Sequence, residues 1–364
     1  MSEKITIKDI ARLAGVSVGS VSTVFSKKST NVHLSEQTRA KILQIAKKYN
    51  YRPNVAARAV QSNQSYLLGF FYTTNNWYLQ NRILRGIRQV CSRRDYDIIV
   101  YPSDNLAEEA YNLQTSHVPH LDGIITIPVL ENDQTNQEAY DALARQGIPI
   151  VQMLVNIWNH FPVFTRDYIK IGYEAIRALY ERDHRAIGLL VFDNYTDPKH
   201  GPGSWGIVKG CQMAAADYAV DLKLHLLDSQ AERPDYIPGA EAITAQILQS
   251  AEQPTALIAS SNYLAYGAYS CLSKHNISIP DQISLISCGD DAEPFRGFVP
   301  NLAHFPTPLE EMGRMSAEYC LAEPDERTVL RQLLYADLIP GDTIGKAIRN
   351  KSNGNRNKYK GQRS

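Results

Sequence analysis

A chain of 364 residues is too long for one small domain and predicts two or three. Apolar residues make up 44% of it, and no run approaches the ~18 consecutive apolar residues that a membrane span needs. The N-terminal residues lack the apolar centre of a signal peptide, so we expect a cytoplasmic protein. The cysteines are odd in number and far apart, which predicts reduced, packed thiols; they are Cys91, Cys211, Cys271, Cys288 and Cys320.

The formal net charge of zero conceals a strong asymmetry along the chain. Residues 1–65 hold eleven Lys/Arg against three acids, and residues 346–364 hold seven basic residues and no acid. The part between them carries 20 basic and 35 acidic residues. A basic head on an acidic body is typical of a nucleic-acid-binding module attached to a body that does not bind nucleic acid. The basic tail 346–364 lacks an apolar pattern, and we expect it to be disordered and solvated.

Two short helices are predicted at the start of the basic head. Thr6 is a good N-cap for the first, whose apolar residues recur at helical spacing as Ile7, Ile10, Ala11, Leu13 and Ala14. Gly15 then supplies the positive φ of a tight turn, and Ser17 caps a second helix that runs to about Phe25 with Val21 and Val24 facing inward. This is a helix-turn-helix pattern, which places the start of the second helix in the DNA major groove. The base-facing side would carry Val18, Gly19, Ser22 and Thr23.

A third helix and a short hinge complete the head. Ser35 opens the helix from Glu36 to about Tyr49, and Ile42, Leu43, Ile45 and Ala46 are expected to close a three-helix core. Asn54 caps the run 55–61, which is too short to be a stable helix alone. We expect it to fold only when DNA and a partner subunit supply contacts.

The segments TIKDIARLAGVSVGSVSTVF and LSEQTRAKILQIAKKYNYRPNVAARAV together resemble the LacI/GalR family of bacterial transcription regulators. The resemblance implies a homodimer on near-palindromic operator DNA, with hinge helices that push an apolar side chain between base pairs in the minor groove. By position Val60 would be that wedge, with Ala57 beside it. The family usually has Leu at the wedge and commonly Arg where this chain has Thr23, so specificity would lean on Ser22, Thr23 and DNA deformability. The DNA-binding set predicted is Thr6, Ser17, Val18, Gly19, Ser22, Thr23, Asn54, Ala57 and Val60.

Strands and helices alternate beyond the polar linker 61–65. The strands are predicted at 66–72, 97–101, 123–127, 148–154, 186–192, 222–227, 255–259 and 283–288. Helical stretches are predicted at 79–94, 135–146, 169–182, 204–218, 238–250 and 263–275. This alternation predicts an α/β fold with parallel, doubly wound sheets, and eight strands fit two sheets better than one.

The resemblance extends over the body and implies a two-lobed core similar to periplasmic binding proteins. The domains expected are a head at 1–52, a hinge and linker at 53–65, an effector-binding and dimerisation core at 66–345, and the tail at 346–364. Lobe one would hold about 66–164 and 293–322, and lobe two about 165–292 and 323–345. YADLIPGDTIG resembles the closing strand of the family.

The three tryptophans fall in predicted loops after strands, which would place them near the cleft between the lobes. Flat aromatic faces bind the C–H faces of sugars or stack on nucleobases. In the family an Arg commonly precedes the helix glycine matched by Gly210, but here Trp205-Gly206-Ile207-Val208-Lys209 has none. Fewer charged side chains in the predicted site favour a neutral ligand, most simply a saccharide. A purine or another small metabolite is the alternative. The effector set predicted is Tyr72, Trp77, Asp104, Trp158, Asp167, Trp205, Ser261, Asn262 and Asp290, with His160 and Tyr263 as further polar candidates.

Competing motifs are weaker than this interpretation. Residues 15–19 fit the G-x-S-x-G hydrolase elbow and 201–206 fit the dinucleotide G-x-G-x-x-G, but neither directly follows a strand. His117 and His120 have no partners for a metal site, so no cofactor or metal is expected. A sugar-binding or sugar-modifying enzyme would need an acid–base pair, for which only Asp167 and Asp290 can be nominated. The sequence thus predicts a DNA-binding regulator, a repressor controlled by its ligand, and not an enzyme; the basic head argues against a pure ligand-binding protein.

Overall fold

The computed structural model describes residues 5–25, 34–51, 62, 64–73, 77–131, 133–199, 201–229, 235–289, 299–328 and 331–347. It divides into two compact units. Unit one is Met1–Met153 with Gly313–Thr328, and unit two is Leu154–Met312 with Val329–Ser364. The pattern had placed the late return to the first lobe at 293–322, whereas the returning segment begins at Gly313. Within the described residues no helix has the length and apolarity to cross a bilayer.

The head contains three helices around a small apolar core. They are α1 (Ile7–Ala14), α2 (Val18–Phe25) and α3 (Glu36–Lys48), each within one residue of its predicted bounds. Ile10, Val21 and Ile42 are fully buried where the three helices meet. Leu43 was predicted to join this core and does not: its side chain is 44% exposed, because it follows Ile42 on the helix and points about 100° away.

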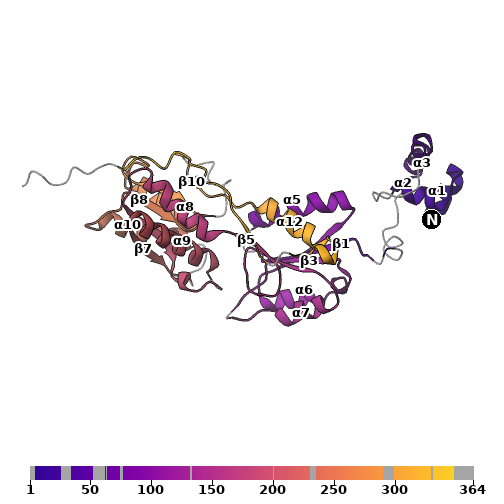
Figure 1. Cartoon of the computed structure of the whole chain (residues 1–364), viewed down its shortest axis with the longest axis horizontal. Helices are drawn as coiled ribbons and strands as arrows, with labels where there is room; N and C mark the ends of the chain where they lie inside the picture. The colour runs from indigo at the N-terminus through magenta and orange to yellow at the C-terminus, as the bar shows by residue number, and fades with distance from the viewer. Residues whose placement is uncertain are drawn as a thin grey trace, which may run out of the picture. The chain divides into compact units, whose positions relative to one another are not determined.

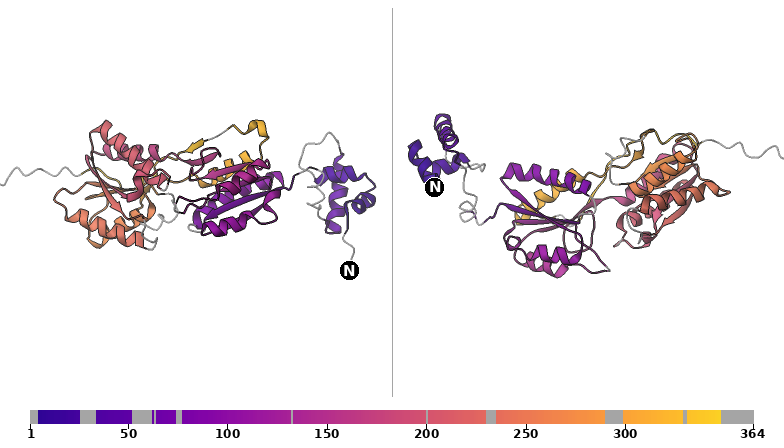
Figure 2. Two further views of the ribbon diagram at one scale, coloured as in Figure 1. Left: turned by 90° about the horizontal axis from the view of Figure 1, so that it is seen from below. Right: turned by 180° about the vertical axis from the view of Figure 1, so that it is seen from behind.

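Unit one has a parallel sheet of β1 (Leu67–Thr73), β2 (Asp97–Ser103), β3 (Gly123–Thr126) and β4 (Ile150–Met153) in the order β4-β3-β1-β2. Figure 1 shows α5 (Trp77–Arg94) and α12 (Leu309–Cys320) on one face, with α6 (Leu106–Leu113) and α7 (Gln137–Arg145) on the other. Figure 2 agrees that α12 lies beside α5. Gly313 permits this, because a side chain there would collide with the carbonyl of Ile83. A segment late in the chain therefore completes a face built early in it.

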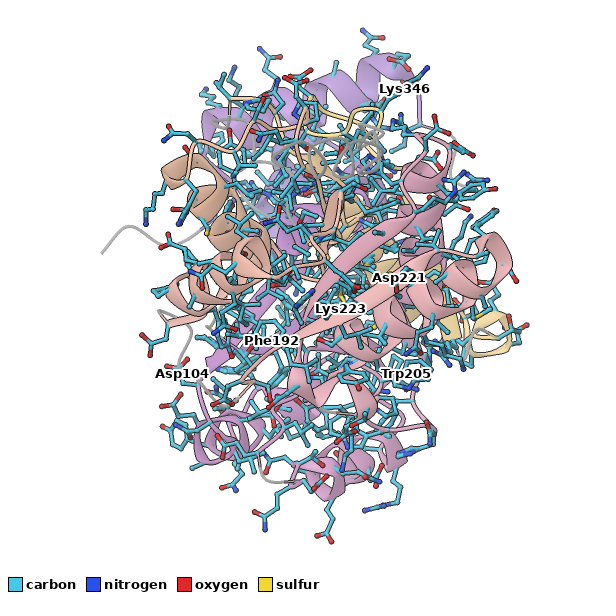
Figure 3. All side chains as sticks on the ribbon, turned by 90° about the vertical axis from the view of Figure 1, so that its left-hand side faces the viewer. Asp104, Phe192, Trp205, Asp221, Lys223 and Lys346 are labelled. Atoms are coloured by element: carbon cyan, nitrogen blue, oxygen red, sulfur yellow. The ribbon has the colours of Figure 1, made fainter. Side chains whose placement is uncertain are left out.

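Unit two holds a second parallel sheet in the order β10-β9-β8-β6-β7, so β7 is an edge strand. Its strands are β6 (Ala186–Phe192), β7 (Asp221–Leu227), β8 (Ala256–Ala259), β9 (Ser284–Ser287) and β10 (Ala303–His304). Figure 3 shows Phe192 and Asp221 at opposite ends of β6 and β7. The carboxyl ends of β6, β8 and β9 therefore share one edge of the sheet.

Four helices cover the two faces of this sheet, namely α8 (Tyr168–Tyr180), α9 (Pro202–Tyr218), α10 (Tyr236–Gln249) and α11 (Asn262–Lys274). Successive side chains of β6 point to opposite faces. Leu189 and Val191 pack with α8 and α9, and Leu190 packs with α10 and α11. Two further strands of unit two, β5 (Val163–Arg166) and β11 (Arg331–Leu334), pair with each other in parallel.

All eight predicted strands are present and they belong to two parallel sheets, as expected. The five cysteines are buried and free, also as expected. β5, β10, β11, α6 and α12 were not predicted, because their apolar runs are short or interrupted by charges. The expected closing strand at 335–345 was wrong: β11 ends at Leu334, and the part beyond it adds one isolated bridge between His304 and Ile339.

Candidate functional site

The start of α2 is held firmly by the turn before it. Gly15 has φ 68° and ψ 35°, the left-handed conformation that the sequence required of it. The Ser17 hydroxyl accepts the Ser20 N–H at 3.0 Å, so Ser17 caps α2 as predicted. Val18, Gly19 and Ser22 are exposed on this helix. A rigid turn thus presents a small, nearly uncharged face at the N-terminus of a short helix.

A reciprocal cap fixes α1 beside it. The Thr6 hydroxyl donates to Asp9 Oδ2 at 2.6 Å, and the Thr6 N–H donates to the same oxygen at 3.1 Å. These bonds, ahead of the nearby Arg12 guanidinium, lower the pKa of Asp9. Asp9 Oδ1 also pairs with Arg12 at 3.2 Å. The carboxylate of Asp9 is therefore bonded within the head. The lysines and arginines of the head give it its net positive charge.

A row of aromatic side chains lies at the carboxyl edge of the unit-two sheet. Phe192 ends β6, and its ring centroid is 4.8 Å from that of Tyr236 at the start of α10. Tyr236 in turn meets Tyr263, in the first turn of α11, edge-on at 5.9 Å. All three are partly exposed. We call Phe192, Tyr236 and Tyr263 the aromatic row.

Polar groups accompany the aromatic row at the same edge. Asp193 follows β6, and hydrogen bonds from Ser229 keep its pKa below the ordinary value, so it is ionised at neutral pH. Ser260 follows β8, is 8% exposed, and its Oγ has no hydrogen-bond partner among the described residues. Ser261 caps α11 through the Leu264 N–H at 3.4 Å. The edge thus offers flat apolar faces, an ionised acceptor and a spare hydroxyl.

Arg166 is a buried cation at the end of β5. It is 2% exposed and donates to the Cys288 carbonyl at 3.0 Å and to the Phe305 carbonyl at 3.1 Å. Its guanidinium also lies 5.3 Å from the centre of the Tyr168 ring. These carbonyls follow β9 and β10, so Arg166 joins the ends of three strands. Its two terminal nitrogens serve the fold of this edge.

Two sequence families account for the two kinds of site. The model of bacterial regulatory proteins of the lacI family matches residues 6–54, and the periplasmic binding protein-like domain matches residues 176–344. The head matches the LacI family of regulatory proteins. The chain is a DNA-binding transcription regulator with a periplasmic-binding-protein-like core, as the sequence predicted.

Known LacI-family proteins match nearly the whole chain. The ribose operon repressor of Haemophilus influenzae is 27% identical over 350 residues, covering 91% of this chain and 99% of its own. Catabolite control protein A of Priestia megaterium is 25% identical, covering 89% and 94%. The lac repressor bound to ONPG superposes with a TM-score of 0.68 at 19% identity, covering 94% of this chain and 100% of its own. These relatives are regulators and not enzymes.

The tryptophans do not all lie where they were predicted. Trp77 is the first residue of α5, and Trp205 lies in the first turn of α9, so neither is in a loop. Figure 3 shows Trp205 apart from Phe192, and Lys209 Nζ lies 4.9 Å from the centre of its ring. Trp158 is in a loop but is 2% exposed and packs edge-on against Phe161 at 5.7 Å. Its face is covered and cannot stack on a ligand in this conformation.

The other predicted effector residues fall at strand ends. Tyr72, near the end of β1, is partly exposed and packs against Phe70 with centroids 4.9 Å apart. Asp104 is exposed after β2. Asp167 follows β5 and is engaged as the N-cap of α8, accepting the Lys170 N–H at 3.0 Å. Asn262 accepts the N–H of Tyr263 at 3.0 Å.

Several predicted residues lie outside the described part of the chain. They are Asn54, Ala57 and Val60 of the hinge and Asp290 of the effector set; of Trp77 only the backbone is described. The sequence interpretation overlooked Phe192, Tyr236, Asp193, Ser260 and Arg166. The available signal was their position directly after a strand or at a helix start, where ligands of such folds bind.

Proposed function

We propose that the chain is a homodimeric repressor whose affinity for a near-palindromic operator changes when a small neutral ligand, most simply a saccharide, binds the core. The observation that carries the ligand class is the aromatic row together with Asp193 and Ser260. Aromatic faces accept the C–H faces of sugars, and carboxylate and hydroxyl groups accept or donate hydrogen bonds to sugar hydroxyls. The related ribose operon repressor makes ribose the first compound to test.

Base contacts in this proposal come from the exposed face of α2. Val18 is 41% exposed and apolar, which suits the methyl group of thymine. The Thr23 hydroxyl donates to the Gly19 carbonyl at 3.0 Å, so it faces DNA as an acceptor. The exposed Ser22 hydroxyl can both donate and accept a hydrogen bond at a base edge. With few polar groups at the groove, DNA shape supplies the rest of the specificity.

A thermal-shift screen tests the ligand. D-ribose, other neutral monosaccharides, disaccharides and nucleobases are added to the full chain, since a ligand at 100 times its Kd stabilises the native state by about 2.7 kcal/mol. We expect a saccharide to raise the melting temperature of the wild type and of Tyr111→Ala, a control on α6 with a 74% exposed side chain. The shift is expected to vanish in Tyr263→Ala. Stabilisation by nucleobases alone would replace the saccharide proposal.

Selection of duplexes from a randomised library tests the DNA arm. We expect a palindromic site whose two half-sites lie on the same face of the DNA double helix. Ser22→Ala is expected to weaken binding to it by roughly tenfold, as loss of a base contact does. Gln44→Ala on the exposed side of α3 serves as the control. Absence of any selected sequence would contradict the proposal.

A further inference from the structure

One carboxylate holds the first residues of the core, directly after the hinge segment. Asp122 Oδ1 accepts the backbone N–H of Ser65 at 2.9 Å, and Oδ2 accepts that of Tyr66 at 2.8 Å. The Asp122 N–H donates to the Leu67 carbonyl at 2.9 Å. Hydrogen bonds to an ionised acceptor are about twice as strong as neutral ones. The direction in which the chain enters β1 is therefore set by a residue that immediately precedes β3.

The backbone at this point is strained, which shows how firmly it is held. Tyr66 has φ 62°, a left-handed conformation that a bulky residue adopts only under strain. Its carbonyl accepts the Asp97 N–H at 2.9 Å, and its ring packs against Tyr96 with centroids 5.3 Å apart. Burial, and then the adjoining Asp122 carboxylate to which the Tyr96 hydroxyl is hydrogen-bonded, raise the pKa of Tyr96.

Ser65 is open to a cavity on one side. A cavity of about 710 Å³ opens at the amino edge of the unit-one sheet, and Ser65, Tyr96 and Asp122 line it. The backbone of Ser65 therefore lacks a close apolar cover on that side. Its N–H is bonded to Asp122, and its hydroxyl accepts the Leu67 N–H at 3.1 Å.

We propose that Asp122 is a positioning residue that fixes how the hinge leaves the core, and so carries a movement of β3 to the DNA-binding head. β3 lies in the interior of the unit-one sheet, between β1 and β4. A shift of this strand moves Asp122 and, with it, the N–H groups of Ser65 and Tyr66. The inference rests on the proposed regulatory function, because it assigns the mechanical link between ligand and DNA.

Asp122→Asn in the full-length protein tests the link, because an amide has one acceptor oxygen and its NH₂ group would face the other N–H. We expect backbone hydrogen exchange at Ser65 and Tyr66 to quicken by about tenfold or more. The preference for the duplex selected by the wild type over a scrambled duplex is expected to fall by a similar factor. Tyr96→Phe keeps both backbone bonds and should show a smaller effect in each assay.

Asp97→Asn is the matched control, because it removes the same charge from an exposed position at the same edge of the sheet. It is expected to match the wild type in both assays. Exchange and DNA preference that stay unchanged in Asp122→Asn would overturn the inference. If the wild type selects no duplex, the proposed function fails instead, and the exchange rates still show whether Asp122 holds the hinge. A melting curve on each variant identifies global unfolding. If Asp122→Asn unfolds, Tyr96→Phe decides, because it removes only the hydroxyl bonded to Asp122. Faster exchange at Ser65 and Tyr66 in that variant supports the inference, and unchanged exchange overturns it.

Discussion

Replacing Gly210 with alanine should destabilise unit two, although alanine is the better helix former. Gly210 lies on α9 where that helix touches α8. A Cβ there would overlap the Ile169 carbonyl oxygen and lie 2.8 Å from the Tyr173 nitrogen. The obstacle is backbone, which cannot rotate away as a side chain can. Gly172 makes the reciprocal approach to the Ile207 carbonyl, so the two helices have no spare distance.

The magnitude follows from two opposing effects. Overpacking of a filled core costs about 1–3 kcal/mol or more, and the upper end applies because backbone must move. Alanine in place of glycine returns roughly 1 kcal/mol of helix propensity. The net loss of about 2 kcal/mol lowers the melting temperature by about 4–8 °C for a unit of this size.

Differential scanning calorimetry of the full chain measures this loss. The control is Gly203→Ala on the same helix, where the nearest atom to a new Cβ is Tyr168 Cε1 at 3.3 Å, on a ring that can shift. We expect Gly203→Ala to melt at or slightly above the wild-type temperature. The steric reasoning is refuted if Gly210→Ala melts no lower than Gly203→Ala.

Three further predictions concern the caps and the buried titratable groups. Thr6→Ala should cost the head about 1 kcal/mol in urea unfolding, whereas Thr6→Ser keeps the capping hydroxyl and should not. Burial lowers the pKa of His184, so its contribution to stability is present above pH 6.5 and is lost below it, as the pH falls through the lower folded-state pKa; His184→Asn should melt with a shallower acid dependence. Burial raises the pKa of Glu109, so stability from this group is present below pH 4.5 and declines as the pH rises through its folded-state pKa; Glu109→Gln should flatten melting temperatures between pH 4.5 and 7.

Much of the fold could be predicted because local chemistry and tertiary structure agree in most elements. β6 is an uninterrupted apolar run, and its observed bounds match the predicted ones. Gly15 and Ser17 act within a few residues of their own position, so their roles follow from the sequence alone. The short strand β5 carries the opposite lesson. It ends in Arg166, whose burial depends on carbonyls 122 and 139 residues away.

The aromatic row at the carboxyl edge of the unit-two sheet was less predictable for the same reason. Trp205 was assigned by residue type, yet its helix places it apart from Phe192. Phe192, Tyr236 and Tyr263 come from three separate segments and meet only because β6 and β8 are neighbours in the sheet. Strand order is a property of the whole unit, and a single sequence carries little signal for it. The DNA-binding head has no such dependence, since its three helices are consecutive.

The edge strand β7 has a consequence for how this protein behaves at high concentration. An uncovered edge presents unpaired backbone groups to which another chain can add a strand. Exposed Asp221 and Lys223 stand on β7 (Figure 3), and Leu226 beyond them is 48% exposed. The buried charge that such an addition would create opposes aggregation. Lys223 thus protects this edge against strand addition. An apolar residue in its place would make the edge hydrophobic and lower the solubility of the protein while the fold stays intact.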